Sequence, residues 1–172
     1  AYQVRLAPGD YQIAGADFDP EGNLWVADEF ASRLVVFSPE GRVRSLHGLR
    51  GKGPDEWYYP RTLRWAREGG DDFLYVCDAW NHRVKKLDRQ GKVVWTYGTY
   101  GPGEEELSEP CDLAWVAGEG IWIVDRGNHR LVLINPEGRW LDTLGREEIV
   151  LPVPGRPPRR LSRPGFYYPQ AL

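Results

Sequence analysis

The feature that most constrains the fold of this sequence is an internal repeat that occurs three times. Each copy contains an apolar run that ends at an aspartate, and the three aspartates are Asp28, Asp78 and Asp125, spaced 50 and 47 residues apart. From each aspartate an arginine follows after 5 residues, and glycines follow after 13 and 20 residues. A repeat of this period indicates stacked supersecondary units, each of which buries its apolar faces against its neighbours.

Each copy predicts four short strands. The second strand is the apolar run, the third starts at the arginine, and the fourth lies between the two glycines. The first strand starts 15 residues before the aspartate at Ile13 and Pro110, and 18 residues before it at Pro60. Four antiparallel strands in about 40–50 residues are typical of a β-propeller blade, and apolar residues on both faces suit stacked blades. We therefore predict one all-β domain, a half or partial six-bladed propeller with blades at 13–48, 60–98 and 110–145.

The composition agrees with many short strands and narrows the range of functions. The chain has 20 Gly, 14 Pro, 8 Trp and 9 Tyr, which favours turns and strands over helices. A formal charge of −3 gives no support to a nucleic-acid binder, and no apolar stretch reaches the ~20 residues needed to cross a bilayer. The sequence has no Met. Removal of a leader would explain this and favours a location outside the cytoplasm, while an excised piece of a longer chain is the alternative.

Two of the repeated turns resemble those of the NHL-repeat family. The segments 78–84 and 125–131 both carry an Asn-His-Arg triplet followed by Val or Leu, and the glycine-rich stretches 48–60 and 98–110 are similar to the family's inter-blade linkers. The first copy, 29–33, lacks the Asn-His pair. The resemblance implies a propeller fold. It does not imply one activity, because the family includes lyases, RNA-binding modules, sensor domains and scaffolds.

The residues that recur in these turns are interpreted as structural. Aspartate can accept turn N–H groups, Asn tolerates the left-handed conformation, and Arg can pair with the aspartate. The alternative makes His82 and His129 metal ligands or acid–base groups. The predicted structural set is Asp28, Arg33, Asp78, Asn81, His82, Arg83, Asp125, Asn128, His129 and Arg130.

Searches for catalytic motifs favour a non-enzymatic protein. The sequence has no nucleophile elbow, phosphate loop or zinc-protease motif, so no catalytic residue and no cofactor is predicted. Asp17 and Asp112 fall on first strands, which line the channel of a propeller. Similar lactonases and lyases hold a divalent metal there, although a hard cation needs about six oxygen ligands. A metal-dependent lyase or lactonase therefore remains an alternative function.

Three other titratable side chains have simpler interpretations. His47 lies near the end of a fourth strand and is predicted to be a solvated edge residue. Cys77 aligns with Ala27 and Val124, so it is predicted to be a small buried residue. A disulfide between Cys77 and Cys111 is left open.

The strand-connecting turns and the linkers of a propeller meet on one rim, which is the predicted binding face. Aromatic and arginine side chains are typical of interface hot spots. Trp57 and Tyr58 have an alternative, which is to pack beneath the next blade. RNA binding is a further alternative, opposed by the glutamates at 104–106. The predicted face consists of Phe30, Arg50, Lys52, Trp57, Tyr58, Tyr59, Trp80 and Arg126, with Arg159, Arg160 and Arg163 on a C-terminal arm.

The C-terminal part of the sequence predicts an extended linker and then a further blade. Residues 146–165 are rich in Pro and Arg and suit an extended arm, and residues 166–172 copy 57–63 and so resemble the start of another first strand. Three blades cannot close a ring, so we expect a protein partner, a second copy or a larger assembly, to cover the open sheets. The predicted function is a scaffold for protein–protein interaction or self-assembly through the linker face.

Overall fold

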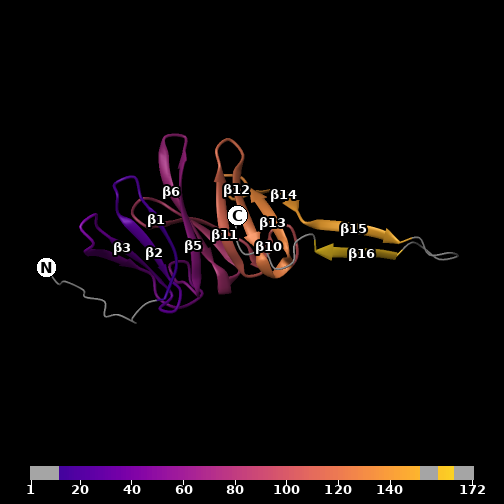
Figure 1. Ribbon diagram of the computed structural model, residues 1–172, viewed down its shortest axis with the longest axis horizontal. Helices are drawn as coiled ribbons and strands as arrows, with labels where there is room; N and C mark the ends of the chain where they lie inside the picture. The colour runs from indigo at the N-terminus through magenta and orange to yellow at the C-terminus, as the bar shows by residue number, and fades with distance from the viewer. Residues whose placement is uncertain (1–11, 152–158, 165–172) are drawn as a thin grey trace.

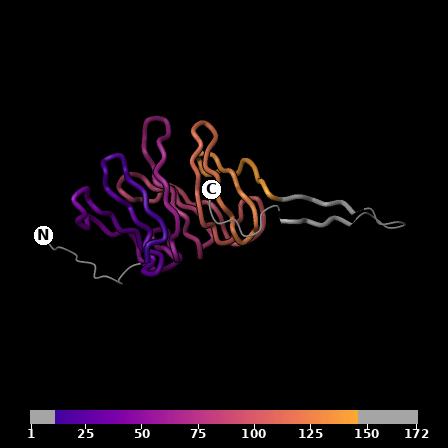
Figure 2. The backbone as a smooth tube through the Cα atoms, viewed as in Figure 1, coloured from indigo at the N-terminus to yellow at the C-terminus, as the bar shows by residue number. Residues whose placement is uncertain are grey.

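The computed structural model describes residues 12–151 and 159–164, and the side chains of residues 12–145. Within these ranges the chain forms three four-stranded antiparallel sheets and two short strand pairs. Figure 1 shows the three sheets side by side in chain order, and Figure 2 follows the backbone from one sheet to the next. The prediction of an all-β partial propeller with three four-stranded blades is confirmed. The predicted start of a further blade, 166–172, lies outside the described residues.

The three sheets have the same internal order, with each strand paired to the next one along the chain. The first sheet contains β1 (Ile13–Phe18), β2 (Leu24–Asp28), β3 (Arg33–Phe37) and β4 (Val43–His47). The second contains β5 (Pro60–Glu68), β6 (Asp71–Asp78), β7 (Arg83–Leu87) and β8 (Val93–Tyr97). The third contains β11 (Pro110–Val116), β12 (Gly120–Asp125), β13 (Arg130–Ile134) and β14 (Trp140–Leu144). Strand β5 lies between β1 and β11, so the first strands are the neighbours along the inner side.

Strand register repeats from sheet to sheet. The aspartate at the end of the second strand pairs with the arginine that starts the third: Asp28 with Arg33, Asp78 with Arg83, and Asp125 with Arg130. In every sheet the register also shifts once between the first two strands and once between the last two. The landmarks found in the sequence therefore occupy equivalent positions in space.

Two apolar clusters hold the sheets together, one in each joint between neighbouring sheets. Strand β6 contributes to both, because side chains alternate between the faces of a strand. Leu74 and Val76 pack toward the first sheet, whereas Tyr75 and Cys77 pack toward the third. This two-sided burial explains why the strands are apolar throughout.

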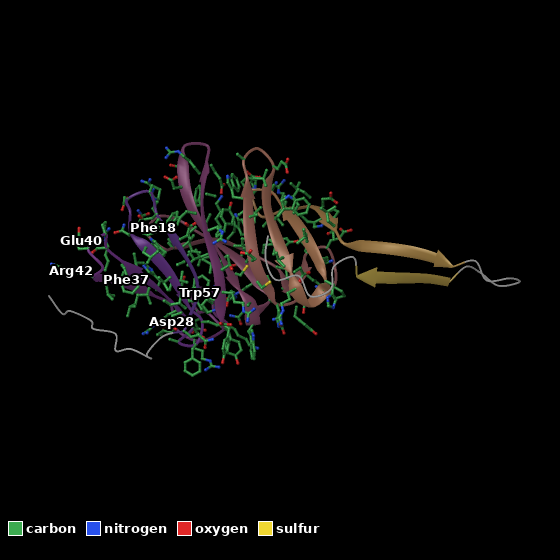
Figure 3. The ribbon with its side chains drawn as sticks, in the orientation of Figure 1. Phe18, Asp28, Phe37, Glu40, Arg42 and Trp57 are labelled. Atoms are coloured by element: carbon green, nitrogen blue, oxygen red, sulfur yellow. The ribbon has the colours of Figure 1, made fainter. Side chains whose placement is uncertain are left out.

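Trp57 belongs to the joint between the first two sheets. Its side chain is 1% exposed and packs in the same cluster as Trp25 and Leu63, toward the end of the sheets where Asp28 lies (Figure 3). The sequence left two interpretations of Trp57 open, and the structure shows the one in which it packs beneath a blade. The prediction that Trp57 lies on the binding face is therefore wrong. The large apolar indole is stabilised by removal from water, which a rim position would not provide.

Part of the segment expected to be an extended linker forms a hairpin. Strand β15 (Arg146–Leu151) pairs antiparallel with β16 (Arg159–Pro164). Apolar and β-branched residues at 149–151 favour a strand here. Arg159, Arg160 and Arg163 lie on β16. Among the residues described, no helix is long and apolar enough to span a bilayer.

Replacing Trp57 by Ala should lower the free energy of unfolding by about 3–5 kcal/mol, because the large cavity left in the joint between sheets cannot fully collapse. Chemical denaturation would measure this change. The matched control is Tyr100→Ala, since Tyr100 is an aromatic residue outside the predicted binding face that is 72% exposed, and its loss should cost under about 1 kcal/mol. Equal losses in the two variants would contradict the burial of Trp57.

Candidate functional site

The repeated turn after each second strand has one defined backbone shape. The turns η1 (Ala79–Asn81) and η2 (Arg126–Asn128) are short 3-10 turns, and each is ended by a histidine with positive φ, 54° at His82 and 55° at His129. In the first sheet Ser32 has the same φ of 54°. The position is thus defined by its left-handed conformation, which only a minority of non-glycine residues adopt.

A buried carboxylate organises the turn of the second sheet. Asp78 is fully buried and accepts hydrogen bonds from the Tyr58 backbone N–H at 2.7 Å, Asn81 Nδ2 at 2.9 Å and Arg83 Nε at 2.7 Å. Burying a charge without such partners would cost several kcal/mol. We call this set of Asp, Asn and Arg the clamp.

The clamp also holds the linker that leads into its own sheet. Asn81 donates to the Gly51 carbonyl at 2.8 Å, and Arg83 donates to the carbonyls of Lys52, Gly53 and Glu56 at 2.9–3.1 Å. The guanidinium fork satisfies these three carbonyls at once.

The third sheet repeats this arrangement with stronger burial. Asp125 and Arg130 are both fully buried and lie 2.6 Å apart. Asn128 donates to Gly101, and Arg130 donates to the carbonyls of three linker residues, which are Pro102, Gly103 and Glu106. In the first sheet Asp28 pairs with Arg33 at 3.0 Å. In all three sheets the aspartate is thus paired with the arginine that starts the next strand.

In the first two sheets the residue that ends the turn contacts the next linker. His82 Nδ1 accepts the backbone N–H of Glu109 at 3.1 Å, and Ser32 Oγ accepts that of Tyr59 at 3.4 Å. Burial lowers the pKa of His82, and a neutral ring is required for Nδ1 to act as an acceptor. His82 therefore acts in the contact between blades.

Two glycines in each linker lie against a glutamate that folds back on the linker. Glu56 accepts the Gly53 N–H at 2.8 Å, and Glu106 accepts the Gly103 N–H at 2.7 Å. A Cβ at Gly51 would clash with the Glu56 carboxylate, and the same holds in the second linker. The glycine-rich sequence of the linkers is explained by this close approach.

Lys85 is a buried cation that the sequence did not single out. Its ammonium donates to the carbonyls of Pro54 at 2.7 Å and Glu56 at 2.6 Å, and lies 4.0 Å from the centre of the Trp57 ring. Burial lowers its pKa to about 8, although Asp78 at 3.7 Å opposes the shift. Valine occupies the equivalent position in the first and third copies, so the second copy has a charged side chain where the other two have an apolar one.

An aromatic cluster with one arginine forms the exposed part of the linker face. The rings of Tyr58 and Tyr59 lie 5.4 and 4.5 Å from that of Trp80, centre to centre. The Arg50 guanidinium lies 4.9 and 5.4 Å from the two tyrosine rings. Trp80 is 47% exposed, and Arg50 is exposed. The structure thus brings together four of the residues predicted for this face, and we call them the aromatic cluster.

The remaining predicted residues of the face lie on other turns and linkers. Phe30 holds the position in the first sheet that Trp80 holds in the second, and it is 63% exposed. Lys52 is exposed on the first linker. Arg126 is half-buried, with Nη1 3.4 Å from the Glu109 carboxylate. Phe30 and Lys52 are therefore exposed side chains that lie outside the aromatic cluster and could bind a partner.

The two channel carboxylates do not fit a metal site. Asp17 accepts the Trp65 backbone N–H at 2.9 Å, and Asp112 lies 3.5 Å from an Arg64 Nη2. Each carboxylate thereby links its sheet to the second sheet. Across the described part of the chain, no group of three or more His, Cys, Asp and Glu side chains is arranged to hold a metal ion. A divalent cation would need ligands beyond these two.

His47 is not a solvated edge residue, as the sequence suggested. Its ring is half-buried, stacks on Trp25 at 4.9 Å and hydrogen bonds to Ser45 Oγ at 2.9 Å, and burial lowers its pKa. Cys77 and Cys111 are both buried thiols. Burial raises the pKa of each, to about 11 for Cys111, so neither is activated as a nucleophile.

Comparison with solved structures shows the fold. A virginiamycin B lyase from Staphylococcus aureus matches with a TM-score of 0.64 and 14% identity, over 99% of this chain and 48% of that one. A streptogramin B lyase matches with 0.60 and 18%, over 79% and 41%. An auxiliary nutrient binding protein from Bacteroides thetaiotaomicron matches with 0.55 and 19%, over 67% and 35%.

This chain spans less than half the length of each of those proteins. No protein-family model matches the sequence, and neither does any curated protein. At such identities the likeness concerns the fold alone. The three sheets are thus part of a β-propeller.

Replacing Arg130 by Met should destabilise the protein by about 3–5 kcal/mol, because the buried Asp125 carboxylate would lose its counter-charge. Three linker carbonyls would lose their donor as well. The matched control is Arg33→Met, since the Arg33 side chain is 23% exposed and water can replace part of what is lost. Denaturant unfolding of both variants measures the difference, and similar losses would contradict the role of burial.

The stability of the protein should rise between about pH 8 and pH 10 because of Lys85. Its pKa is about 8 in the folded chain and about 10.4 when unfolded, so in this window the unfolded chain holds a proton that the folded chain has released. The free energy of unfolding then increases with pH, by at most about 1.4 kcal/mol per unit. Lys85→Met should remove this rise.

The control for this experiment is Lys92→Met, because Lys92 is exposed. Denaturant unfolding at several pH values compares each variant with the wild type, which cancels contributions from tyrosines. A rise that persists in Lys85→Met would show that another group causes it.

Proposed function

We propose that this chain is a non-catalytic, NHL-like propeller scaffold that associates with another protein through its linker face, and that the partner is a second copy of the chain. The observation that carries this proposal is the aromatic cluster, in which Trp80, Tyr58, Tyr59 and Arg50 contact one another at the surface. The clamps hold the surrounding turn and linker in place. The face is therefore organised before any partner binds, which reduces the entropy lost on association.

The chemistry of the aromatic cluster suits a protein interface. Tryptophan, tyrosine and arginine are the residue types that most often dominate binding energy, because they bury large area with few rotatable bonds. Other turns and linkers carry charged pairs, including Arg61 with Glu29 at 3.0 Å and Arg126 with Glu109 at 3.4 Å. Interfaces between proteins typically combine an aromatic centre with polar residues nearer the rim.

The outer faces of the first and third sheets offer a second surface for self-assembly. In the first sheet Phe18, Leu24 and Phe37 form one cross-strand row on the face away from the second sheet, and Phe18 is 63% exposed. In the third sheet Trp122 pairs with Leu133 on the face away from the second sheet, and both are half-buried. These faces are equivalent to those that pack together inside the chain, so a blade of another copy would fit them.

Each of the two alternative functions can be tested by a separate experiment. A metal-dependent lyase or lactonase would need ligands besides Asp17 and Asp112, and stoichiometric metal in the purified protein would support it. RNA binding would use arginines on the face and the arm, and RNA retention that falls steeply with salt would support it. Neither has a contact among the described residues that favours it over protein binding.

Light scattering on the purified chain should give a mass of twice 19.7 kDa at high concentration and a lower mass on dilution. Combining Trp80→Ala with Arg50→Ala should raise the dissociation constant at least tenfold, since loss of a hot spot costs about 2 kcal/mol or more. Lys92→Ala, a change on an exposed turn outside the linker face, should leave the mass unchanged.

A second pair of changes, Phe18→Lys with Leu133→Lys, distinguishes the two surfaces. Retention of the dimer in this pair supports the linker face. Loss of the dimer only in this pair would show that the outer sheet faces make the contact and that the linker-face assignment is wrong. A mass of 19.7 kDa at every concentration would overturn self-association altogether.

A further inference from the structure

The joint between the first and second sheets contains a cavity of about 430 Å³ at its outer end. Its walls include Trp25, Val36, Ser45 and His47 from the first sheet and Arg89 from the β7–β8 turn of the second. A volume of this size can hold a small organic ligand. The next joint, between the second and third sheets, shows what such a space accommodates.

Equivalent positions in the two joints carry side chains of very different size. In the second sheet one cross-strand row runs Tyr75, Lys86, Trp95 across β6, β7 and β8. In the first sheet the same row runs Trp25, Val36, Ser45 across β2, β3 and β4. Val36 thus replaces a lysine, and Ser45 replaces a tryptophan. The cavity lies where the second sheet places these two larger side chains.

In the joint between the second and third sheets, the indole of Trp95 is held by the turn of the third sheet. Trp95 Nε1 donates to the Pro136 carbonyl at 3.0 Å, and its ring lies against Gly138 and 5.6 Å from the Tyr75 ring. Lys86 donates to the same Pro136 carbonyl at 3.0 Å. In the first joint, Arg89 and Gly91 occupy the places of Pro136 and Gly138 in the repeat. The backbone there can present a carbonyl in the same way.

The smaller ring of His47 fills only part of this space. It stacks on Trp25 at 4.9 Å, and it lies against Gly91 as Trp95 lies against Gly138. An imidazole is smaller than an indole, and Ser45 adds only a hydroxyl. The remaining volume lies against the Trp25 ring and Val36, while most of the other lining side chains are polar, so an aromatic ring with a polar group suits it.

The mouth of the cavity carries two arginines and two carboxylates, one of which is Asp19. Arg44 and Arg89, from neighbouring sheets, are 59% and 43% exposed. Arg44 Nη1 donates to Asn23 Oδ1 at 2.9 Å, and Arg89 Nη2 pairs with the buried Asp72 carboxylate at 2.5 Å. Glu21, the other carboxylate, lies 3.9 Å from an Nη1 of each arginine, which is the outer limit of an ion pair, and Glu21 is itself 57% exposed. Each guanidinium has further N–H groups outside its contact with Asn23 or Asp72, so a ligand carboxylate that takes the place of Glu21 could accept a hydrogen bond from both arginines.

We propose that this cavity binds a small aromatic carboxylate of about the size of an indole, with the ring in the space that Trp95 fills in the next joint and the carboxylate between Arg44 and Arg89. The site is independent of the proposed linker-face function. It lies at the outer end of the sheets, whereas the aromatic cluster lies on the linkers.

Calorimetric titration with indole-3-acetate tests the proposal. The wild type should bind with a dissociation constant of about 1 mM or tighter, given the usual affinity per atom of small ligands. Acetate, which lacks the ring, should bind at least tenfold more weakly. 3-Methylindole, which lacks the carboxylate, should be weakened in the same way.

Two variants assign the binding to this cavity. Ser45→Trp copies the second sheet, so it should fill the cavity, raise the melting temperature and abolish binding. Arg44→Gln should weaken indole-3-acetate at least tenfold and leave 3-methylindole unchanged. Arg42→Gln changes another arginine of the same hairpin that does not line the cavity, and it should bind like the wild type.

Each result of these titrations either supports or overturns the proposal. No heat of binding from the wild type at millimolar indole-3-acetate would overturn the proposal, and so would unchanged binding in folded Ser45→Trp. If Ser45→Trp fails to fold, Arg44→Gln still decides, because equal affinity in Arg44→Gln and Arg42→Gln would show that the carboxylate is not held there.

Discussion

The structure depends on a buried carboxylate at the end of each second strand. Asp78 and Asp125 are removed from water and must be matched by donors in fixed places. Arg83 and Arg130 supply the counter-charge, and their remaining N–H groups hold the carbonyls of the linker. One interaction therefore ends a strand, shapes a turn and fixes the path of the chain into the sheet. The position of each sheet relative to the one before it follows from this contact.

The residues that the three repeats share build the fold. The residues that differ between the repeats create possible binding sites. The clamps and the apolar rows recur in all three sheets or in two of them. Trp80 is matched by Phe30 and Gly127, so the aromatic cluster occurs on one turn only. Ser45 is matched by Trp95, so the first joint is open beside Ser45 at the place where the second joint holds an indole. Both proposals for function rest on such differences.

Much of the architecture could be predicted because residues that recur at fixed spacing mark where each strand begins and ends. The spacing of these Asp, Arg and Gly residues predicts the strands, the shared role of the turn residues and the glycine-rich linkers. Trp57 and Lys85 could not be placed in this way. Whether an indole in a linker faces water or a neighbouring sheet depends on how the linker curls, and only the clamp contacts determine that curl. A lysine in a strand reads as exposed, yet Lys85 is fully buried because linker carbonyls surround its ammonium.

The sequence by itself determined that this chain forms successive four-stranded antiparallel sheets with apolar faces, because strand period and turn chemistry are local properties. It also determined which residues recur and so belong to the fold. Only the tertiary structure decided that His47 stacks on Trp25, that Asp17 and Asp112 link sheets, and that a cavity remains beside Ser45. These features arise between residues of different sheets, where packing depends on the size and shape of both partners, and no local pattern along the chain records that fit.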